Sequence, residues 1–217
     1  MIANVVATTC MWCSSSPIFN EPDDFAMAHL KSEFPALLTV RLRLREPVPD
    51  DCGAFHDLLS IPEVTRFSNW SDEPKKAQTE RVIKWMRGAF AKGKGCAWMI
   101  EDRASGRFLG SIRFNSIDKH SRWAEIGYEL HPSFWGKGIM SDAVTAVARC
   151  GFDNFSLNRI EAWTLPGNGA SGRVLEKAGF RYEGTLRQKA WFKNAFHDFR
   201  MFGRLAGESP EVLPQES

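Results

Sequence analysis

Two closely spaced glycines, Gly136 and Gly138, stand in the segment HPSFWGKGIMS, which runs from His131 to Ser141. A strand-like run ends at His131-Pro132, and a helix-like apolar pattern follows the glycines. Glycine lets the backbone turn sharply and lets a ligand approach closely. The free N–H groups of a first helical turn, with the positive end of the helix dipole, form a site for an anion. The spacing therefore predicts that a diphosphate can bind at this turn.

The glycine turn has three other interpretations. A Walker phosphate loop requires G-x-x-x-x-G-K-[ST], which this sequence lacks. A dinucleotide fingerprint needs a third glycine where Ser141 stands, and it occurs early in a βαβ unit, whereas three strands of antiparallel type precede this turn. A turn that uses glycine only for close packing stays open as an alternative.

Helices and strands must position this turn, and the hydrophobic pattern predicts their order. Alternation predicts a half-buried strand over 37–45 with a solvated arginine face. The pattern then predicts helices at 49–59 and 73–91, strands at 96–101, 108–115 and 122–131, a helix at 136–152, a strand at 159–164, a helix at 168–178, and strands at 180–188 and 196–205. The strand–helix–strand unit implies a parallel pair with a right-handed crossover. We therefore expect an α/β domain with a mixed sheet and helices on both faces.

The composition fits a single folded domain. The chain has 217 residues, of which 43% are hydrophobic and 25% charged, as in ordinary globular proteins. It has no apolar run of the length that a transmembrane helix needs. A net charge of +2 gives no reason to expect nucleic acid or a membrane surface as partner. A homodimer is compatible with the sequence.

The five cysteines and five histidines are scattered. Their spacing matches neither a disulfide framework nor a metal site, so no metal is expected. Cys10 and Cys13 form a C-x-x-C without a second pair, which we interpret as two incidental thiols. The first cation is Lys31, so a basic signal-peptide region is not evident and the expected compartment is the cytoplasm.

The glycine turn resembles the acetyl-CoA motif of the GNAT superfamily of N-acetyltransferases, Q/R-x-x-G-x-G/A after the fourth strand. Residues 133–138 match it except that Ser133 replaces Gln or Arg. Four segments in order resemble the RimJ/RimL branch, which acetylates protein N-termini. They are LLTVRLRLREPVPDD (37–51), IPEVTRFSNW (61–70), HPSFWGKGIMSDA (131–143) and NGASGRVLEKAGFRYEGTLR (168–187).

The resemblance covers about residues 37–205 and implies the fold and domain limits. It implies a GNAT-like, mostly antiparallel mixed sheet with one splayed parallel strand pair and helices on both faces. Residues 1–36 would then be an N-terminal extension, 37–205 the N-acetyltransferase domain and 206–217 a flexible acidic tail.

The same resemblance implies where acetyl-CoA binds. The diphosphate would lie on the backbone amides around the turn, with the pantetheine arm along strand 122–131 where that strand parts from 159–164. A bulge near Tyr128 to Leu130 would direct an N–H at the acetyl oxygen. The residues assigned to acetyl-CoA are Tyr128, Leu130, Trp135, Gly136, Lys137, Gly138, Ile139, Met140, Asn168 and Ser171.

Acetyl transfer to an amine needs a base for the amine proton, and Glu125 is the candidate. Alternation places Glu125 on the same strand face as Gly127, which would leave room for substrate, and as Glu129, the reserve base. Alternatively, Glu125 is a solvated carboxylate or one paired with Arg122 or Arg113.

A proton for the leaving thiolate would come from Ser171. Many members of the resembling family carry a tyrosine where this chain has Leu175, so Ser171 or a water must act, or no acid is needed. Asn168 would bind the pantetheine arm and is also well suited as a helix N-cap. Phe67, Trp70 and Trp191 are the candidates for the acceptor side, although tryptophan more often serves packing.

These features predict a direct transfer from acetyl-CoA to a primary amine. The family resemblance alone implies a protein N-terminal α-amine as the favoured acceptor. One alternative is an acetyltransferase for a small amine such as an aminoglycoside, a polyamine or an amino acid. A cluster of Glu125, Glu129, Glu183 and Asp198 in the cleft would favour a cationic small acceptor. Another alternative is a sensor that binds CoA without chemistry.

Overall fold

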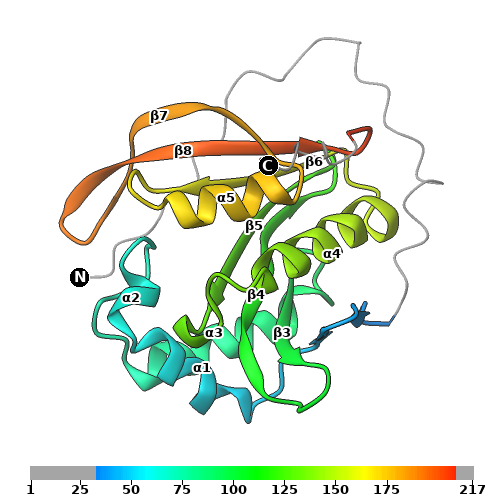
Figure 1. Ribbon diagram of the computed structural model, residues 1–217, viewed down its shortest axis with the longest axis vertical. Coiled ribbons are helices and arrows are strands. Elements are labelled where there is room, and N and C mark those ends of the chain that lie inside the picture. Colours follow the sequence, from blue (N-terminus) through cyan, green and yellow to red (C-terminus); the bar gives the residue numbers. More distant parts are fainter. Residues whose placement is uncertain (1–32, 209–217) are drawn as a thin grey trace, which may run out of the picture. The chain divides into compact units, whose positions relative to one another are not determined.

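One sheet of eight strands runs through the part of the chain that the computed structural model describes, residues 33–208 (Figure 1). The strand order is β1-β2-β3-β4-β5-β6-β8-β7. Neighbouring strands are antiparallel except β5 and β6, which are parallel. The strands are β1 (Leu37–Leu38), β2 (Leu42–Arg45), β3 (Cys96–Asp102), β4 (Phe108–Asp118), β5 (Trp123–Leu130), β6 (Arg159–Thr164), β7 (Arg181–Phe192) and β8 (Ala195–Leu205). The predicted mixed sheet with one parallel pair is confirmed.

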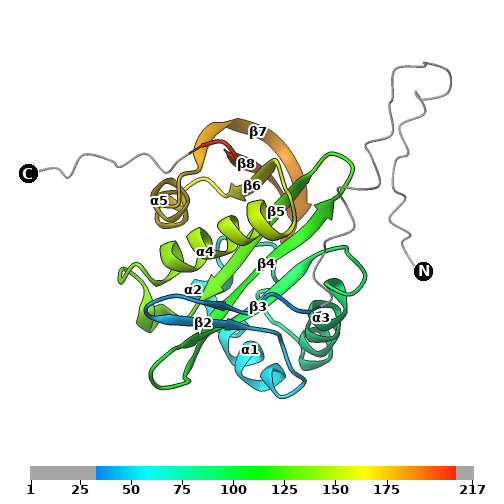
Figure 2. The same ribbon diagram turned by 90° about the vertical axis from the view of Figure 1, so that its right-hand side faces the viewer.

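Helices cover both faces of the sheet, as expected (Figure 2). They are α1 (Asp51–Leu59), α2 (Pro62–Thr65), α3 (Lys76–Ala89), α4 (Ile139–Asn154) and α5 (Gly169–Lys177). β3 is buried on both sides, and its alternating residues join two separate cores. Trp98 and Ile100 pack in the core formed with α4 and α5, whereas Ala97 and Met99 pack in the core formed with α1 and α3.

The parallel pair separates half-way along its length. β5 and β6 are paired from Trp123 and Arg159 to Glu125 and Glu161, and no further. Beyond this point β5 stays paired with β4 as far as Leu130, and β6 stays paired with β8 as far as Thr164. The strands therefore splay apart, as the family resemblance implied, and the backbone edge of β5 that faces β6 is opened.

The prediction of one continuous strand over 37–45 is wrong, because the chain turns back on itself there. β1 and β2 form a hairpin in which Leu37 pairs with Leu44. The Thr39 hydroxyl accepts hydrogen bonds from the backbone N–H groups of Arg41 and Leu42, at 3.2 and 2.9 Å. Such a side-chain bond competes with strand pairing and stabilises a turn. Val40, expected on the buried face, is 90% exposed.

Other differences from the predicted elements are smaller. Helix α2 was not predicted, and α3 begins after Pro74 rather than including it. The predicted strand 180–188 extends to Phe192, because a bulge between Leu186 and Ala190 interrupts the pairing without ending the strand.

Residues 33–36, within the predicted extension, contact the core. Phe34 packs edge-on against Phe90, and the Trp98 indole donates to the Pro35 carbonyl at 2.7 Å. Cys10 and Cys13 lie outside the described residues. No helix within residues 33–208 has the length and apolar character needed to cross a membrane.

Candidate active site

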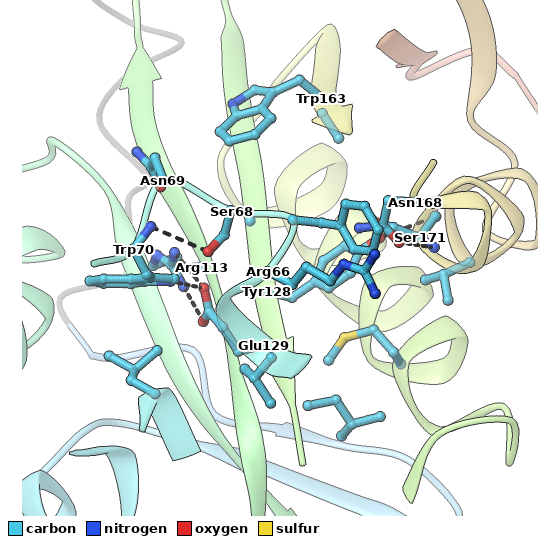
Figure 3. Close-up of a pocket in the computed structure, with 18 of the residues that line it drawn as sticks. Arg66, Ser68, Asn69, Trp70, Arg113, Tyr128, Glu129, Trp163, Asn168 and Ser171 are labelled. Atoms are coloured by element: carbon cyan, nitrogen blue, oxygen red, sulfur yellow. Dashed lines mark hydrogen bonds and ion pairs between the residues drawn. The ribbon is translucent and has the colours of Figure 1, made fainter. Parts of the chain in front are cut away.

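A cleft of about 1710 Å³ opens where β5 and β6 part. Its walls come from the segment between α1 and α3, from β5, from the glycine turn and α4, from the start of α5, and from β7 and β8. Figure 3 shows side chains from these walls converging on one space. The predicted residues that line it are Phe67, Trp70, Glu125, Tyr128, Leu130, Trp135, Gly136, Gly138, Ile139, Met140, Asn168 and Ser171. Lys137 and Trp191 are not among the lining residues, and Trp191 is 60% exposed and packs against Phe196.

Both glycines of the turn have left-handed backbone conformations, with φ of 72° at Gly136 and 73° at Gly138. Gly138 caps the N-terminus of the sixteen-residue helix α4. A Cβ atom on Gly136 would meet nothing within 4 Å, so close packing does not explain this glycine. The conformation does, because only glycine adopts it without strain. The first N–H groups of α4 have no intrahelical partner by geometry and lie at the cleft, which suits an anion.

Arg41 supports the glycine turn from outside the cleft. Its guanidinium donates to the Lys137 carbonyl at 2.8 Å and to the Asp142 carboxylate at 2.6 and 2.9 Å. Arg41 therefore neutralises the one acidic residue in the first turn of α4 and holds the loop that precedes it. Sequence analysis missed this role and assigned Arg41 to a solvated strand face. No local signal could reveal it, since Arg41 and Asp142 are 101 positions apart.

Glu125 lies half-buried at the point where the parallel strands part. Its carboxylate accepts a hydrogen bond from Asn115 Nδ2 at 2.8 Å. Neither predicted cationic partner pairs with it: Arg113 binds Glu129, and Arg122 donates to the Ser156 carbonyl. Glu125 is thus a cleft carboxylate without an arginine partner among the described residues.

Gly127 lines the cleft beside Glu125, and a Cβ atom there would lie 2.9 Å from Asn115 Nδ2, so the glycine also makes room for the Asn115 amide. The prediction of a bulge near Tyr128 to Leu130 is wrong, because these residues pair regularly with β4. The irregularity lies instead in β4, between Phe114 and Ser116, and it lets Asn115 reach Glu125.

Glu129 is buried in a dense network of donors (Figure 3). Its carboxylate accepts from Arg113 at 2.6 and 2.9 Å, from the Trp70 indole at 2.6 Å and from the Ser111 hydroxyl at 2.8 Å. Burial raises the pKa of Glu129, but the Arg113 charge and the hydrogen bonds outweigh burial and hold the pKa below its ordinary value. With its oxygens engaged, Glu129 anchors Trp70 to the sheet and is poorly placed to act as a reserve base.

Two hydroxyl groups meet on the α5 side of the splay. Tyr128 Oη and Ser171 Oγ are 2.6 Å apart, and burial raises the pKa of Tyr128 well above its ordinary value, so that its proton is retained. The Asn168 side chain accepts from the Ser171 backbone N–H at 3.2 Å, which is the expected N-cap of α5. Leu175 is fully buried. Sequence analysis assigned Tyr128 to the cofactor but did not foresee its bond to Ser171.

Aromatic side chains and two cations of α5 form further parts of the cleft walls. Trp163 from β6 stacks on Phe199 from β8 at 4.1 Å, and Phe192 lies beside them. On α5, Arg173 and Lys177 line the cleft one helical turn apart. Sequence analysis missed both cations, although their i, i+4 spacing was a usable signal.

The predicted cluster of four carboxylates does not form. Of the four, Glu125 and Glu129 line the cleft, and Glu129 is paired with Arg113. Glu183 instead pairs with Arg159, and Asp198 accepts from the Gln188 backbone N–H. The other acidic residues of the lining are Glu63, Asp72 and Glu73.

Comparison with known proteins gives this arrangement its context. Residues 41–181 match the family described as "Acetyltransferase (GNAT) domain". The chain belongs to the GNAT acetyltransferase family. The expectation of a RimJ/RimL-like member is also confirmed, since the relatives of this GNAT protein include ribosomal-protein acetyltransferases.

Two GNAT relatives and one solved structure illustrate the similarity. The chain is 34% identical over 169 residues to the uncharacterized N-acetyltransferase YoaA of Bacillus subtilis, covering 78% of this chain and 96% of that protein. It is 31% identical over 139 residues to the ribosomal-protein-serine acetyltransferase of Escherichia coli, covering 63% and 76%. A crystal structure of a GNAT-family acetyltransferase from Bacillus anthracis superimposes with a TM-score of 0.72 at 26% identity, covering 80% of this chain and all of that one.

The chain is therefore an N-acetyltransferase of the GNAT family, which uses acetyl-CoA as co-substrate. The residues at the glycine turn fit that molecule, because a glycine cradle at a helix N-terminus accepts a diphosphate. Within residues 33–208, no group of three histidine, cysteine, aspartate or glutamate side chains could hold a metal ion.

Proposed function

We propose that this protein transfers the acetyl group of acetyl-CoA directly to the α-amine at the N-terminus of a protein. The observation that carries the proposal is the opening between β5 and β6, which has Glu125 at its apex and the glycine turn at the end of β5. This arrangement would hold an extended thioester with its reactive end beside a carboxylate.

For the co-substrate, we assign the diphosphate to the backbone amides of residues 135–140. Arg173 and Lys177 supply positive charge on the facing helix, which favours a ligand with several phosphates. The opened edge of β5 offers backbone groups to the amides of the pantetheine arm, as in strand addition. Acetyl-CoA supplies the acetyl group and leaves as the thiol.

Glu125 is our candidate for the base. The ordinary pKa of an α-amine is about 8, so much of it is protonated at neutral pH and must lose a proton before attack. A lysine side chain, with an ordinary pKa of about 10.4, is harder to deprotonate. Glu125 lines the cleft without an arginine partner among the described residues, so its carboxylate can accept that proton directly or through a water.

Ser171 is our candidate for the acid. As the new C–N bond forms and the C–S bond breaks, the sulfur takes a proton from the Ser171 hydroxyl. Solvent returns a proton to Ser171 and accepts the amine proton from Glu125, which restores both groups. The short bond to Tyr128 orients that hydroxyl. Transfer without a covalent enzyme intermediate is supported because no cysteine among residues 33–208 lines the cleft.

One observation favours a protein α-amine as acceptor. The Escherichia coli relative, which is 31% identical, is a ribosomal-protein-serine acetyltransferase. The cleft lining carries both signs of charge, because Glu63, Asp72 and Glu73 lie beside cations such as Arg66 and Arg81, so its charge does not single out a polycationic small molecule.

Thiol release from acetyl-CoA, measured against a panel of N-terminal peptides and small amines, tests the proposal. We expect the highest kcat/KM with peptides that carry a free α-amine and loss of turnover when that amine is blocked. Turnover of small amines in preference to peptides would contradict the proposed acceptor. CoA binding without turnover of any acceptor would instead indicate a sensor.

A further inference from the structure

The turn between β7 and β8 contacts the segment between α1 and α3 at one end of the cleft, although the two are far apart in the sequence. Lys193 lies in the turn between β7 and β8, where it and Asn194 have left-handed φ values of 50° and 57°. Its Nζ donates to the Thr65 carbonyl at 2.7 Å and forms an ion pair with Asp72 at 2.6 Å. Thr65 and Asp72 flank the segment that carries Phe67 and Trp70. The Lys193 side chain is 18% exposed, so its stem is packed rather than free in solvent.

Phe67 provides a second contact between segment 65–72 and the opposite wall of the cleft. A Cβ atom on Gly167, in the turn between β6 and α5, would lie 3.4 Å from the Phe67 ring. Segment 65–72 therefore contacts the opposite wall at both Gly167 and Lys193. Trp163, labelled in Figure 3, lines the wall that it faces. Phe192 and Phe199 line the same wall. The opening beside Glu125 thus has segment 65–72 on one side and residues of β6, β7 and β8 on the other.

We propose that the contacts of Lys193 with Thr65 and Asp72 close the acceptor end of the cleft into a portal that selects acceptors by width. This inference rests on the proposed function and names the property of the acceptor that matters. An amine on a slender, extended chain, such as a peptide N-terminus, passes the portal. An amine on a bulky multi-ring scaffold, such as an aminoglycoside, meets segment 65–72.

The energetics suit a portal better than a structural brace. Asp72 is 70% exposed, and exposed ion pairs contribute about 0–1 kcal/mol to folding because water and salt screen them. Selection by a steric obstacle does not need a strong bond, since it acts by excluding the wrong acceptor rather than by binding the right one.

The test compares acetylation of a short α-amino peptide with that of a multi-ring aminoglycoside. Lys193→Glu and Asp72→Lys each replace the ion pair by repulsion, and we expect each to raise the aminoglycoside-to-peptide ratio of kcat/KM about tenfold. Lys193→Arg keeps both contacts and should retain the wild-type ratio. The double variant Lys193→Glu/Asp72→Lys restores the ion pair and should recover much of the selectivity. Lys189→Glu is the matched control, because it changes the same charge at an exposed position of the same hairpin.

Unchanged ratios in both single variants would overturn the portal, provided that the peptide is turned over. Hydrogen exchange followed by mass spectrometry gives a second readout that does not need turnover. Lys193→Glu should accelerate exchange in segment 65–72 and leave α4 unchanged. If exchange in that segment stays at the wild-type rate, the contacts do not hold the portal and the inference fails even if the acceptor remains unknown. Failure of the wild type to acetylate any amine would count against the proposed function alone.

Discussion

Glu125 and Glu129 have the same side chain and lie on the same face of β5, yet their surroundings differ sharply. Glu129 is surrounded by donors and paired with Arg113, whereas Glu125 has a neutral amide partner, Asn115. A carboxylate that already neutralises a buried guanidinium cannot take up a substrate proton without breaking that pair. The environment, not the residue type, therefore divides the two glutamates into an anchor and a candidate base.

Replacing Glu125 by Gln should lower kcat about a hundredfold, because a positioned base contributes a factor of about 10²–10⁴. The KM for acetyl-CoA should stay within about twofold. The defect should shrink as pH rises past the pKa of the acceptor amine, since less of the amine then needs a base. The measurement is the pH profile of kcat for Glu125→Gln beside Glu80→Gln, an exposed helix control. A wild-type profile in the variant would remove Glu125 from the mechanism.

The hydroxyl pair formed by Tyr128 and Ser171 predicts coupled effects. If Tyr128 acts by orienting Ser171, Tyr128→Phe should lower kcat about fivefold and Ser171→Ala about tenfold, while the double variant should resemble Ser171→Ala alone. The readout is kcat at saturating acetyl-CoA for all four proteins of the cycle. Independent effects, with the two losses multiplying in the double variant, would show that Tyr128 does not act through Ser171.

Among the elements, the β5–α4 connection combines three features that act together. β5 separates from β6, Gly136 and Gly138 turn the chain in left-handed conformations, and α4 begins with free N–H groups. Arg41 then fixes the connection from the β1–β2 hairpin. The anion site is consequently a property of the connected elements and not of any one side chain.

Gly136→Ala should weaken CoA binding about tenfold. Nothing would clash with the new Cβ atom, but the left-handed conformation costs a non-glycine residue about 1–2 kcal/mol, so the turn should relax away from the ligand-binding shape. The dissociation constant of CoA by titration calorimetry checks this. Gly53→Ala in α1 is the matched control: it also meets nothing within 4 Å, has no positive φ, and should raise stability by about 0.5–1 kcal/mol without changing CoA affinity. Equal CoA affinity in both variants would contradict the role of the turn.

At the scale of the whole molecule, two cores share one sheet, and the cleft lies between elements that belong to different cores. The pair of Arg113 and Glu129 connects the two cores. It joins β4 to β5, and the Glu129 carboxylate also accepts a hydrogen bond from Trp70 of segment 65–72. The Trp70 ring in turn contacts Phe55 of the second core. Breaking this network should therefore lower the free energy of unfolding of the whole domain.

The pH dependence of unfolding tests the network. The folded pKa of Glu129 is depressed, so its contribution to stability is present above the unfolded value near 4.5 and is lost as pH falls through the folded value. At pH 7, Glu129→Gln should lower the free energy of unfolding by about 3 kcal/mol, because it leaves the Arg113 charge unpaired. The difference in free energy of unfolding between wild type and Glu129→Gln should narrow at pH values below the unfolded-state pKa of Glu129, because wild type then loses the same negative charge. Denaturant unfolding from pH 3 to 7 measures it, and Trp70→Phe, which removes only the indole donor, covers the case in which Glu129→Gln does not fold. A constant gap across that range would contradict the network.

Much of the fold followed from local patterns. The limits of β6 agree with the prediction to the residue, and α5 ends near Gly179 as expected, because alternation and cap residues act over a few neighbouring positions. The hairpin at Thr39 and the bulge at Gln188 escaped prediction. In both places a few residues interrupt an otherwise regular alternation, and alternation alone does not show where a strand turns back or continues.

The sequence by itself determined the turn at Gly136 and Gly138, the position of Glu125 on β5, and the family, because these depend on residue type and short spacing. Only the tertiary structure decided which partner each charge has. Arg113 could have paired with Glu125 or Glu129, and Arg41 and Lys193 could each have faced solvent. The contacts of Arg41 with Asp142 and of Lys193 with Thr65 span 101 and 128 positions, so no local pattern encodes them. They arise when the sheet places distant segments side by side, and the same placement shapes the acceptor end of the cleft.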